Sequence, residues 1–225
     1  MSIALFDHLH AKLRSHPLAW RLVVGTRILL CAGFLPTGIV KMLGQPFTVI
    51  STKTPVGLFF HAMHQTGPYW QFLGATQVIA SILLLIPAAA HLGAMIFFPV
   101  ILNIFVITVS MDFKGTPVVT GLMLLASLLL VVWDYHRWRG LVTTEPLSIA
   151  TPEPRRLSPA ERVAYAAGAA FGLIFFLTTR GLAPRVVGMP SLVGAGLAML
   201  AALALASRRP WREAREQATP SIVLP

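Results

Sequence analysis

Residues 91–110 have the sequence HLGAMIFFPVILNIFVITVS, which contains no Asp, Glu, Lys or Arg. A run of this length and polarity is typical of a helix that crosses a bilayer, because about 20 apolar residues span the hydrocarbon core. Three further segments, Trp20–Leu43, Tyr69–Ala90 and Pro117–His136, are similarly long and apolar. Since lipid cannot hydrogen-bond an exposed backbone, each segment is expected to be helical. The sequence therefore predicts an all-α, polytopic membrane helix bundle.

The overall composition agrees with this class. Hydrophobic residues make up 56% of the chain and charged residues only 12%, and the mean hydropathy is +0.73. A soluble globular domain carries a much more charged surface. The net charge of +10 does not indicate nucleic-acid binding, because the Lys and Arg residues gather at the ends of apolar segments.

Two more apolar segments follow a change of composition. Residues 139–159 are rich in proline and polar side chains, which predicts an extended linker. Small residues recur at every fourth position in the segments that follow, and such stripes let helices approach closely. We expect a hairpin of two further spans, six in all, although a second copy of the chain is an alternative partner for the stripes. The predicted organisation is an amphipathic lead-in (1–19), a four-span bundle (20–138), the linker (139–159), a two-span hairpin (160–207) and a polar tail (208–225).

Positive charge is distributed unevenly along the chain. Twelve Lys and Arg residues precede the first span, lie between the fourth and fifth spans or follow the sixth, whereas five lie in the alternate loops. The positive-inside rule then predicts a bacterial inner-membrane protein with both termini in the cytoplasm. The first span lacks a cleavage pattern, so we expect it to be retained. Cys31 is the single cysteine, which excludes an intrachain disulfide and a cysteine-rich metal site.

Few polar side chains interrupt the spans, and they mark the first candidate site. Arg27 and Lys41 fall on one stripe of the first span. Gln77 in the second span and Asn103 in the third belong near the middle of the membrane, where an amide needs a hydrogen-bond partner. We expect them to bond each other, Arg27 or a ligand. Two alternatives stay open: Arg27 extends to the cytoplasmic head groups, and the amides only join helices.

A second set of candidates lies on the expected outer side. Thr54 precedes a proline and is typical of a helix N-cap, and the helix that follows places His61 and His64 on one face. Asp112 and Lys114 lie in the turn between the third and fourth spans. Such groups can transfer protons, but they are too few for a zinc site, so no metal is expected. The alternative is that the histidines are simply solvated at the interface.

The first span resembles that of the DoxX-like family of small four-helix bacterial membrane proteins in its pattern of Arg27, Gly33, Phe34, Gly38 and Lys41. The resemblance covers residues 20–138 and includes the second span, where the family usually has Glu and Gly at the positions of Gln77 and Ser81. It implies a DoxX-like four-helix core and a subunit of a membrane redox system such as thiosulfate:quinone oxidoreductase. Because an amide does not titrate in the physiological range, Gln77 is not expected to transfer protons.

These observations together predict a protein that binds a hydrophobic small molecule, such as a quinone, within a membrane oxidoreductase system. The predicted ligand-binding residues are Arg27, Lys41, Gln77, Asn103 and Lys114. The predicted catalytic, proton-transferring residues are Asp112, His61 and His64. The sequence has no haem, flavin or iron–sulfur motif, so we expect a protein partner that carries the redox centres.

Two other classes of function stay open. One is an enzyme that acts on a lipid or isoprenoid by acid–base chemistry, for which Asp112 is the carboxylate at the outer end of the bundle. The other is a non-catalytic assembly or transport subunit, for which the small-residue stripes of the fifth and sixth spans are the working surface. The sequence does not decide whether the protein is an enzyme.

Overall fold

The computed structural model describes residues 3–48, 50–141, 143–144, 158–179 and 184–207. Every regular element among these residues is helical, which confirms the predicted all-α class. The elements are α1 (Ile3–Ser15), α2 (Pro17–Met42), α3 (Pro55–Gln65), α4 (Pro68–Leu85), α5 (Ala90–Ser110), α6 (Thr116–Trp133), α7 (Tyr135–Trp138), η1 (Arg139–Leu141), α8 (Pro159–Thr179), η2 (Arg185–Val187) and α9 (Gly188–Ser207). Most of the predicted linker and the whole predicted tail lie outside the described residues.

Four helices are long and apolar enough to cross a membrane: α2 from Leu18, α4, α5 and α6. They correspond to the four predicted spans. Their outward faces are apolar, with Leu29, Phe72 and Leu125 each about 60% exposed (59%, 63% and 63%). Apolar surface of this extent is stable against lipid rather than water. In α9 the described apolar stretch, Val193–Ala202, is shorter, and the fifth and sixth spans stay a prediction.

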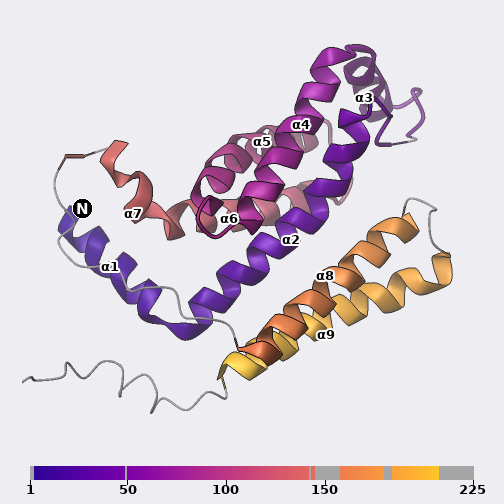
Figure 1. The fold of residues 1–225 in the computed structure, drawn as a ribbon. Helices are drawn as coiled ribbons and strands as arrows, with labels where there is room; N and C mark the ends of the chain where they lie inside the picture. The colour runs from indigo at the N-terminus through magenta and orange to yellow at the C-terminus, as the bar shows by residue number, and fades with distance from the viewer. Residues whose placement is uncertain (1–2, 49, 142, 145–157, 180–183, 208–225) are drawn as a thin grey trace, which may run out of the picture.

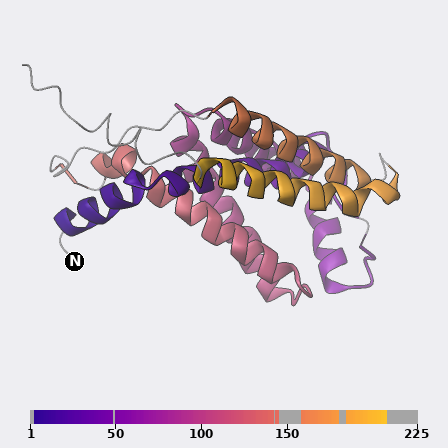
Figure 2. The same cartoon turned by 90° about the horizontal axis from the view of Figure 1, so that it is seen from below.

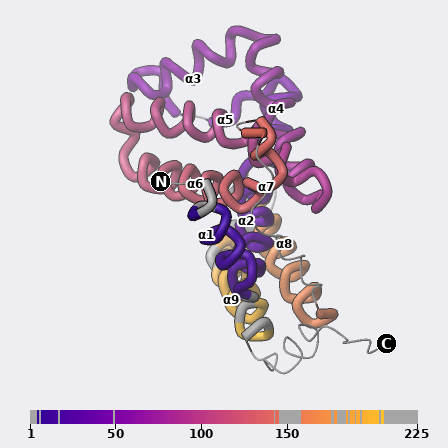
Figure 3. Tube along the Cα trace, turned by 90° about the vertical axis from the view of Figure 1, so that its left-hand side faces the viewer, coloured from indigo at the N-terminus to yellow at the C-terminus, as the bar shows by residue number. Residues whose placement is uncertain are grey.

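Helix α2 is the centre of the arrangement. It packs against α4 and α6 on one side and against the α8–α9 hairpin on the other, while α5 joins α4 to α6. Figure 1 shows the hairpin separated from α4–α6 by α2, and the tube in Figure 3 shows the same order. The chain therefore has a four-helix bundle and an attached two-helix layer.

Glycines bring α2 and α4 into close contact. A methyl group added at Gly38 would lie 3.0 Å from the Gly74 carbonyl oxygen, and one added at Gly74 would overlap the backbone nitrogen of Met42. Small residues allow this close approach. In lipid the hydrophobic effect does not drive helices together, so van der Waals packing holds them instead. The close contact places the side chains of Lys41 and Gln77 next to each other.

Aromatic and aliphatic side chains fill the centre of the bundle. The Phe34 and Phe97 rings lie 4.4 Å apart between centroids, and Leu30, Ile101 and Leu130 around them are at most 3% exposed. The four spans therefore enclose a packed core.

The α8–α9 hairpin is attached to α2 by a buried ion pair. Arg21 Nη2 lies 3.2 Å from Glu161 Oε2, and Arg21 Nε donates to the other carboxylate oxygen. The two side chains are 2% and 0% exposed. Within the hairpin, a methyl group at Gly168 would lie 3.6 Å from Ala198 Cβ. The two helices thus pack against each other as predicted.

The remaining helices lie at opposite ends of the bundle. Helix α1 meets α2 at a sharp angle (Figure 1) and extends beyond the spans, as Figure 2 shows from below. Helix α3 lies beyond the far end of α2. Thr54 caps α3, because its Oγ1 accepts a hydrogen bond of 3.1 Å from the Gly57 backbone N–H, which confirms the predicted helix start. We call these two regions the Asp134 end, with α1 and α7, and the Lys41 end, with α3.

Candidate functional site

The structure joins two predicted ligand-binding residues at the Lys41 end. Lys41 Nζ donates a hydrogen bond of 3.2 Å to Gln77 Oε1. Both residues are buried, with 9% and 3% of their surface exposed. A primary ammonium inside an apolar helix bundle is costly unless its environment stabilises the charge. The pair is therefore the leading candidate for a binding site.

Two aromatic rings add to the environment of Lys41. Its Nζ lies 4.7 Å from the centroid of Phe47 and 5.3 Å from that of Trp70, within the range of cation–π attraction. Trp70 is itself fixed by its Nε1–H, which donates to the Gln45 carbonyl oxygen at 3.0 Å. An ammonium, an amide and two rings therefore meet at one point.

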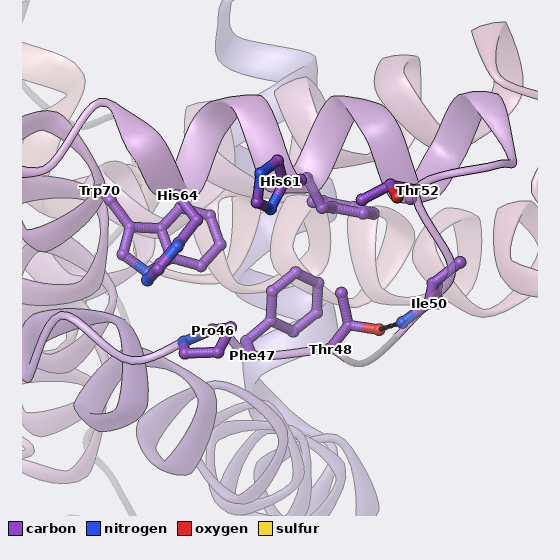
Figure 4. A pocket seen from close by; sticks show the side chains of 10 residues that line it. Pro46, Phe47, Thr48, Ile50, Thr52, His61, His64 and Trp70 are labelled. Atoms are coloured by element: carbon purple, nitrogen blue, oxygen red, sulfur yellow. Dashed lines mark hydrogen bonds between the residues drawn. The ribbon is translucent and has the colours of Figure 1, made fainter.

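A cavity of about 60 Å³ that is open on one side borders these rings. Its wall contains Phe47 and Trp70 together with His61 and His64. Figure 4 shows the two imidazoles on α3 and the Phe47 ring rising from the facing segment. The Phe47 and Trp70 rings thus line the cavity and also contact the ammonium, and we call them the shared wall.

The two histidines of α3 differ in their surroundings. His64 Nε2–H donates to the Gly44 carbonyl oxygen at 3.0 Å, and its ring meets Trp70 edge to face, with centroids 5.9 Å apart. His61 is exposed and accepts a hydrogen bond of 3.0 Å from Gln65 Nε2. Only His64 is thus held against the aromatic wall.

Asp112 and Lys114 are exposed in the turn between α5 and α6. Asp112 has a positive φ of 46°, a conformation that non-glycine residues seldom adopt. The turn approaches α3 through the rings of Phe113 and Phe60, whose centroids are 6.4 Å apart. These two predicted site residues therefore lie near the cavity rim, outside its described wall.

The expectation that the amides of Gln77 and Asn103 bond each other or Arg27 is wrong, while a ligand as their partner stays a prediction. Asn103 is exposed on α5, because Phe97 and Ile101 define the buried face and a residue two positions after Ile101 points about 200° away. Arg27 is about 21 Å along the helix from Lys41 and bonds elsewhere. Neither side chain meets Gln77, whose carbonyl oxygen accepts from Lys41.

Arg27 belongs to an ionic network at the Asp134 end. Its Nη2 lies 2.8 Å from Asp134 Oδ2, and Arg14 Nη1 lies 3.9 Å from Asp134 Oδ1. Arg14 Nη1 and His10 Nε2–H also donate to the Trp133 carbonyl oxygen, at 2.8 and 2.9 Å. This network was not predicted from the sequence.

Aromatic rings enclose the second arginine. Arg14 Cζ lies 4.5 Å from the ring centroid of Trp20 and 4.9 Å from that of Trp133. The guanidinium is therefore held by the carboxylate, a carbonyl and two indole rings. One signal in the sequence was available: Asp7, His10 and Arg14 are spaced by three and four residues, which places polar groups on one helical face.

The histidines of this network are neutral near pH 7. Burial, and next the positive charge of Arg14, lower the pKa of His136 to about 4. Burial also lowers the pKa of His10, against the opposing effect of its hydrogen bond to Trp133. The rings lie 5.7 Å apart between centroids. Protonating either one would add positive charge next to Arg14.

The comparisons with known proteins do not identify a family. No protein-family model matches the chain, and no solved structure matches it. The chain is similar to the uncharacterized protein YwoB of Bacillus subtilis (strain 168), with 29% identity over 130 residues that cover 54% of this chain and 82% of the relative. The relative's name specifies no ligand or reaction. The function must therefore be argued from the site.

Proposed function

We propose that the Lys41 end binds the polar head of a hydrophobic small molecule, with a quinone as the leading candidate, as one subunit of a membrane oxidoreductase system. The observation that carries the proposal is the buried Lys41–Gln77 hydrogen bond behind the wall of Phe47 and Trp70. It combines hydrogen-bond donors with aromatic faces at the end of the membrane-spanning helices. Those are the features that a flat ring with two carbonyl oxygens requires.

Each group has a role in this proposal. The Lys41 ammonium and the Gln77 amide N–H donate to a carbonyl oxygen of the ring, while Trp70 stacks against its face. His64, which also lines the cavity, donates its Nε2–H to the second oxygen in place of the Gly44 carbonyl oxygen, or supplies a proton when the ring is reduced. Electrons come from the partner protein, so the described side chains bind and exchange protons only.

The small volume of the cavity limits how much of a ligand it can accept without a movement of the protein. Its volume of about 60 Å³ is below the roughly 300–1,000 Å³ of typical ligand pockets, so it accepts the edge of a ring. Rotation of the Phe47 ring out of the shared wall would join the cavity to the Lys41–Gln77 pair. The proposal therefore includes an outward movement of the segment that carries Phe47 when the ligand binds.

Family and orientation are parts of the same proposal. The pattern of Arg27, Gly38 and Lys41 in the first span supports membership of the DoxX-like family, for which the packed four-helix bundle is suitable. The uneven distribution of Lys and Arg along the sequence supports an inner-membrane protein with the Asp134 end in the cytoplasm. A topology reporter fused after Lys53 should then score as external, and a cytoplasmic score would overturn the orientation.

The test is to purify the protein in a mild detergent and to identify any stoichiometric hydrophobic molecule by mass spectrometry and absorption. We expect a quinone that is lost in Lys41→Met and Gln77→Leu, because both changes remove donors while keeping side-chain volume. Lys53→Met removes an exposed lysine from the same end and is the control that should retain it. Retention in all three variants would refute the site, and a bound isoprenoid lipid instead would favour lipid chemistry.

A further inference from the structure

Helix α1 has its polar face towards the bundle and its apolar face outward, which is the reverse of a helix on the surface of a soluble protein. Asp7, His10 and Arg14 are buried against the bundle, with 3–4% of their surface exposed. Leu5, Leu9 and Leu13, one turn apart on the other face, are 48%, 52% and 40% exposed. We call these three the leucine ridge. A water-facing helix would have its apolar face inward, so the ridge requires an apolar partner.

The polar face cannot turn outward without breaking several contacts. His10 and Arg14 donate to the Trp133 carbonyl oxygen, and Asp7 Oδ2 lies 3.4 Å from Arg139 Nη2. These bonds connect α1 to the end of α6 and to the short helical segment after it. The leucine ridge is therefore held outward by the fold.

Among the described residues of this end, the exposed charge has a single sign. The described carboxylates here are Asp7, Asp134 and Glu161, and each is buried in an ion pair with arginine. In the described part of this end, the exposed residues that carry a permanent charge are Lys12, Arg137 and Arg162. At the Lys41 end, by contrast, an exposed carboxylate, Asp112, accompanies the exposed lysines. The Asp134 end thus has a surface that is complementary to anions.

We infer that α1 lies in the membrane interface and that the Asp134 end is a binding surface for anionic phospholipids. The ridge lies at the boundary of the acyl chains, next to the start of the span at Leu18. Lys12, Arg137 and Arg162 contact the phosphates of the head groups. Each basic side chain near an anionic lipid surface contributes about a fivefold preference.

The position of α1 can be tested with a bimane probe in nanodiscs that contain phosphatidylcholine and phosphatidylglycerol. The full chain carries Cys31→Ala with a single new cysteine by substitution of Leu9, or of Lys53 as the control. We expect quenching by doxyl-labelled lipid and protection from iodide at position 9, and the reverse at position 53. Equal quenching by iodide at both positions would overturn the inference. Energy transfer between probes at position 9 on two copies would also overturn it, since a second copy would then cover the ridge.

Lipid preference provides an independent test. Native mass spectrometry of the full chain with mixed lipids should show roughly 100-fold enrichment of phosphatidylglycerol over phosphatidylcholine, because three basic side chains each contribute about fivefold. Lys12→Gln should reduce the enrichment about fivefold, and combining it with Arg137→Gln and Arg162→Gln should abolish it. Lys53→Gln removes the same charge from the opposite end and should leave it unchanged. No enrichment in the unmodified protein, or equal loss in Lys12→Gln and Lys53→Gln, would overturn the proposed surface.

Discussion

The two ends of the bundle use buried cations differently. At the Asp134 end, Arg14 and Arg27 share the carboxylate of Asp134. At the Lys41 end, the buried ammonium meets an amide and two aromatic rings, with a cavity behind them. A carboxylate that holds two arginines from different helices connects those helices. A cation whose described partners are neutral can exchange one of them for a ligand, so the comparison distinguishes a structural end from the end that is proposed to bind.

The largest effect is expected from Asp134→Ala. It would leave two buried arginines without their carboxylate. Removing one partner of a buried ion pair lowers the free energy of unfolding by about 3–5 kcal/mol. We expect the melting temperature in detergent to fall by about 10 °C. Asp112→Asn, at the exposed turn of the other end, should change it by less than about 2 °C. Equal melting temperatures for Asp134→Ala and the unmodified protein would contradict a structural role for the network.

The second effect is a dependence on pH that belongs to the Asp134 end. The pKa of His136 is about 4 in the folded protein against 6.5 ordinarily, so between these values the unfolded chain binds more protons. The free energy of unfolding then increases with pH in this interval. The contribution of His136 to the free energy of unfolding is fully present above about pH 6.5. It decreases as the pH falls towards 4, by at most about 1.4 kcal/mol per pH unit.

Melting temperatures measured from pH 7.5 to 4.5 check this dependence. His136→Asn should flatten the curve, and the residual slope reports His10, whose pKa is lowered in the same direction. His61→Asn at the Lys41 end is the matched control and should keep the full slope. If the His136 and His61 variants have the same slope, the buried imidazole is not the cause.

The third prediction concerns the binding end. Lys41→Met leaves the buried Gln77 carbonyl oxygen without its donor, so we expect a loss of stability of about 1–3 kcal/mol, less than in Asp134→Ala. The affinity for an added short-chain quinone should fall at least tenfold, because a charge-assisted hydrogen bond contributes about 1.5–3 kcal/mol. Isothermal titration in detergent measures the affinity. A melting temperature that falls as far as in Asp134→Ala would contradict the division between the two ends.

The smallest effect is expected from Thr54→Ala. It removes the oxygen that accepts the Gly57 N–H at the start of α3, and loss of an N-cap costs about 1 kcal/mol. Because α3 carries one wall of the cavity, hydrogen exchange should increase in Pro55–Gln65 and stay unchanged in α1. Exchange that increases equally in both helices would show that the two ends are coupled, rather than independent.

Local patterns predicted several elements that the structure contains. The four spans followed from runs of apolar residues, because the requirement for about 20 such residues applies to each segment separately. The start of α3 followed from Thr54 and the proline after it. The pairing of α8 with α9 followed from small residues at intervals of four, of which Gly168 faces Ala198. Each of these predictions needs only a short window of sequence.

The candidate site was predicted less completely, for a reason that Asn103 and Gln77 illustrate. Both are amides near the middle of predicted spans, but Gln77 faces α2 and Asn103 is exposed. Hydropathy gives the depth of a residue, whereas the packing of neighbouring helices decides which face is inside. On α5 the fully buried Phe97 and Ile101 decide it.

The sequence by itself determined that this chain is a helical protein with four helices suited to a membrane, and it identified Lys41 and Gln77 as polar groups inside them. Only the tertiary structure decided their partners. Arg27 and Asp134 are separated by 107 positions in the sequence. The polar face of α1 likewise has its partners at the end of α6, far away along the chain. Span formation depends on the local balance of apolar surface and backbone hydrogen bonds. Charge pairing depends on which helix faces meet after packing, which a local pattern does not contain.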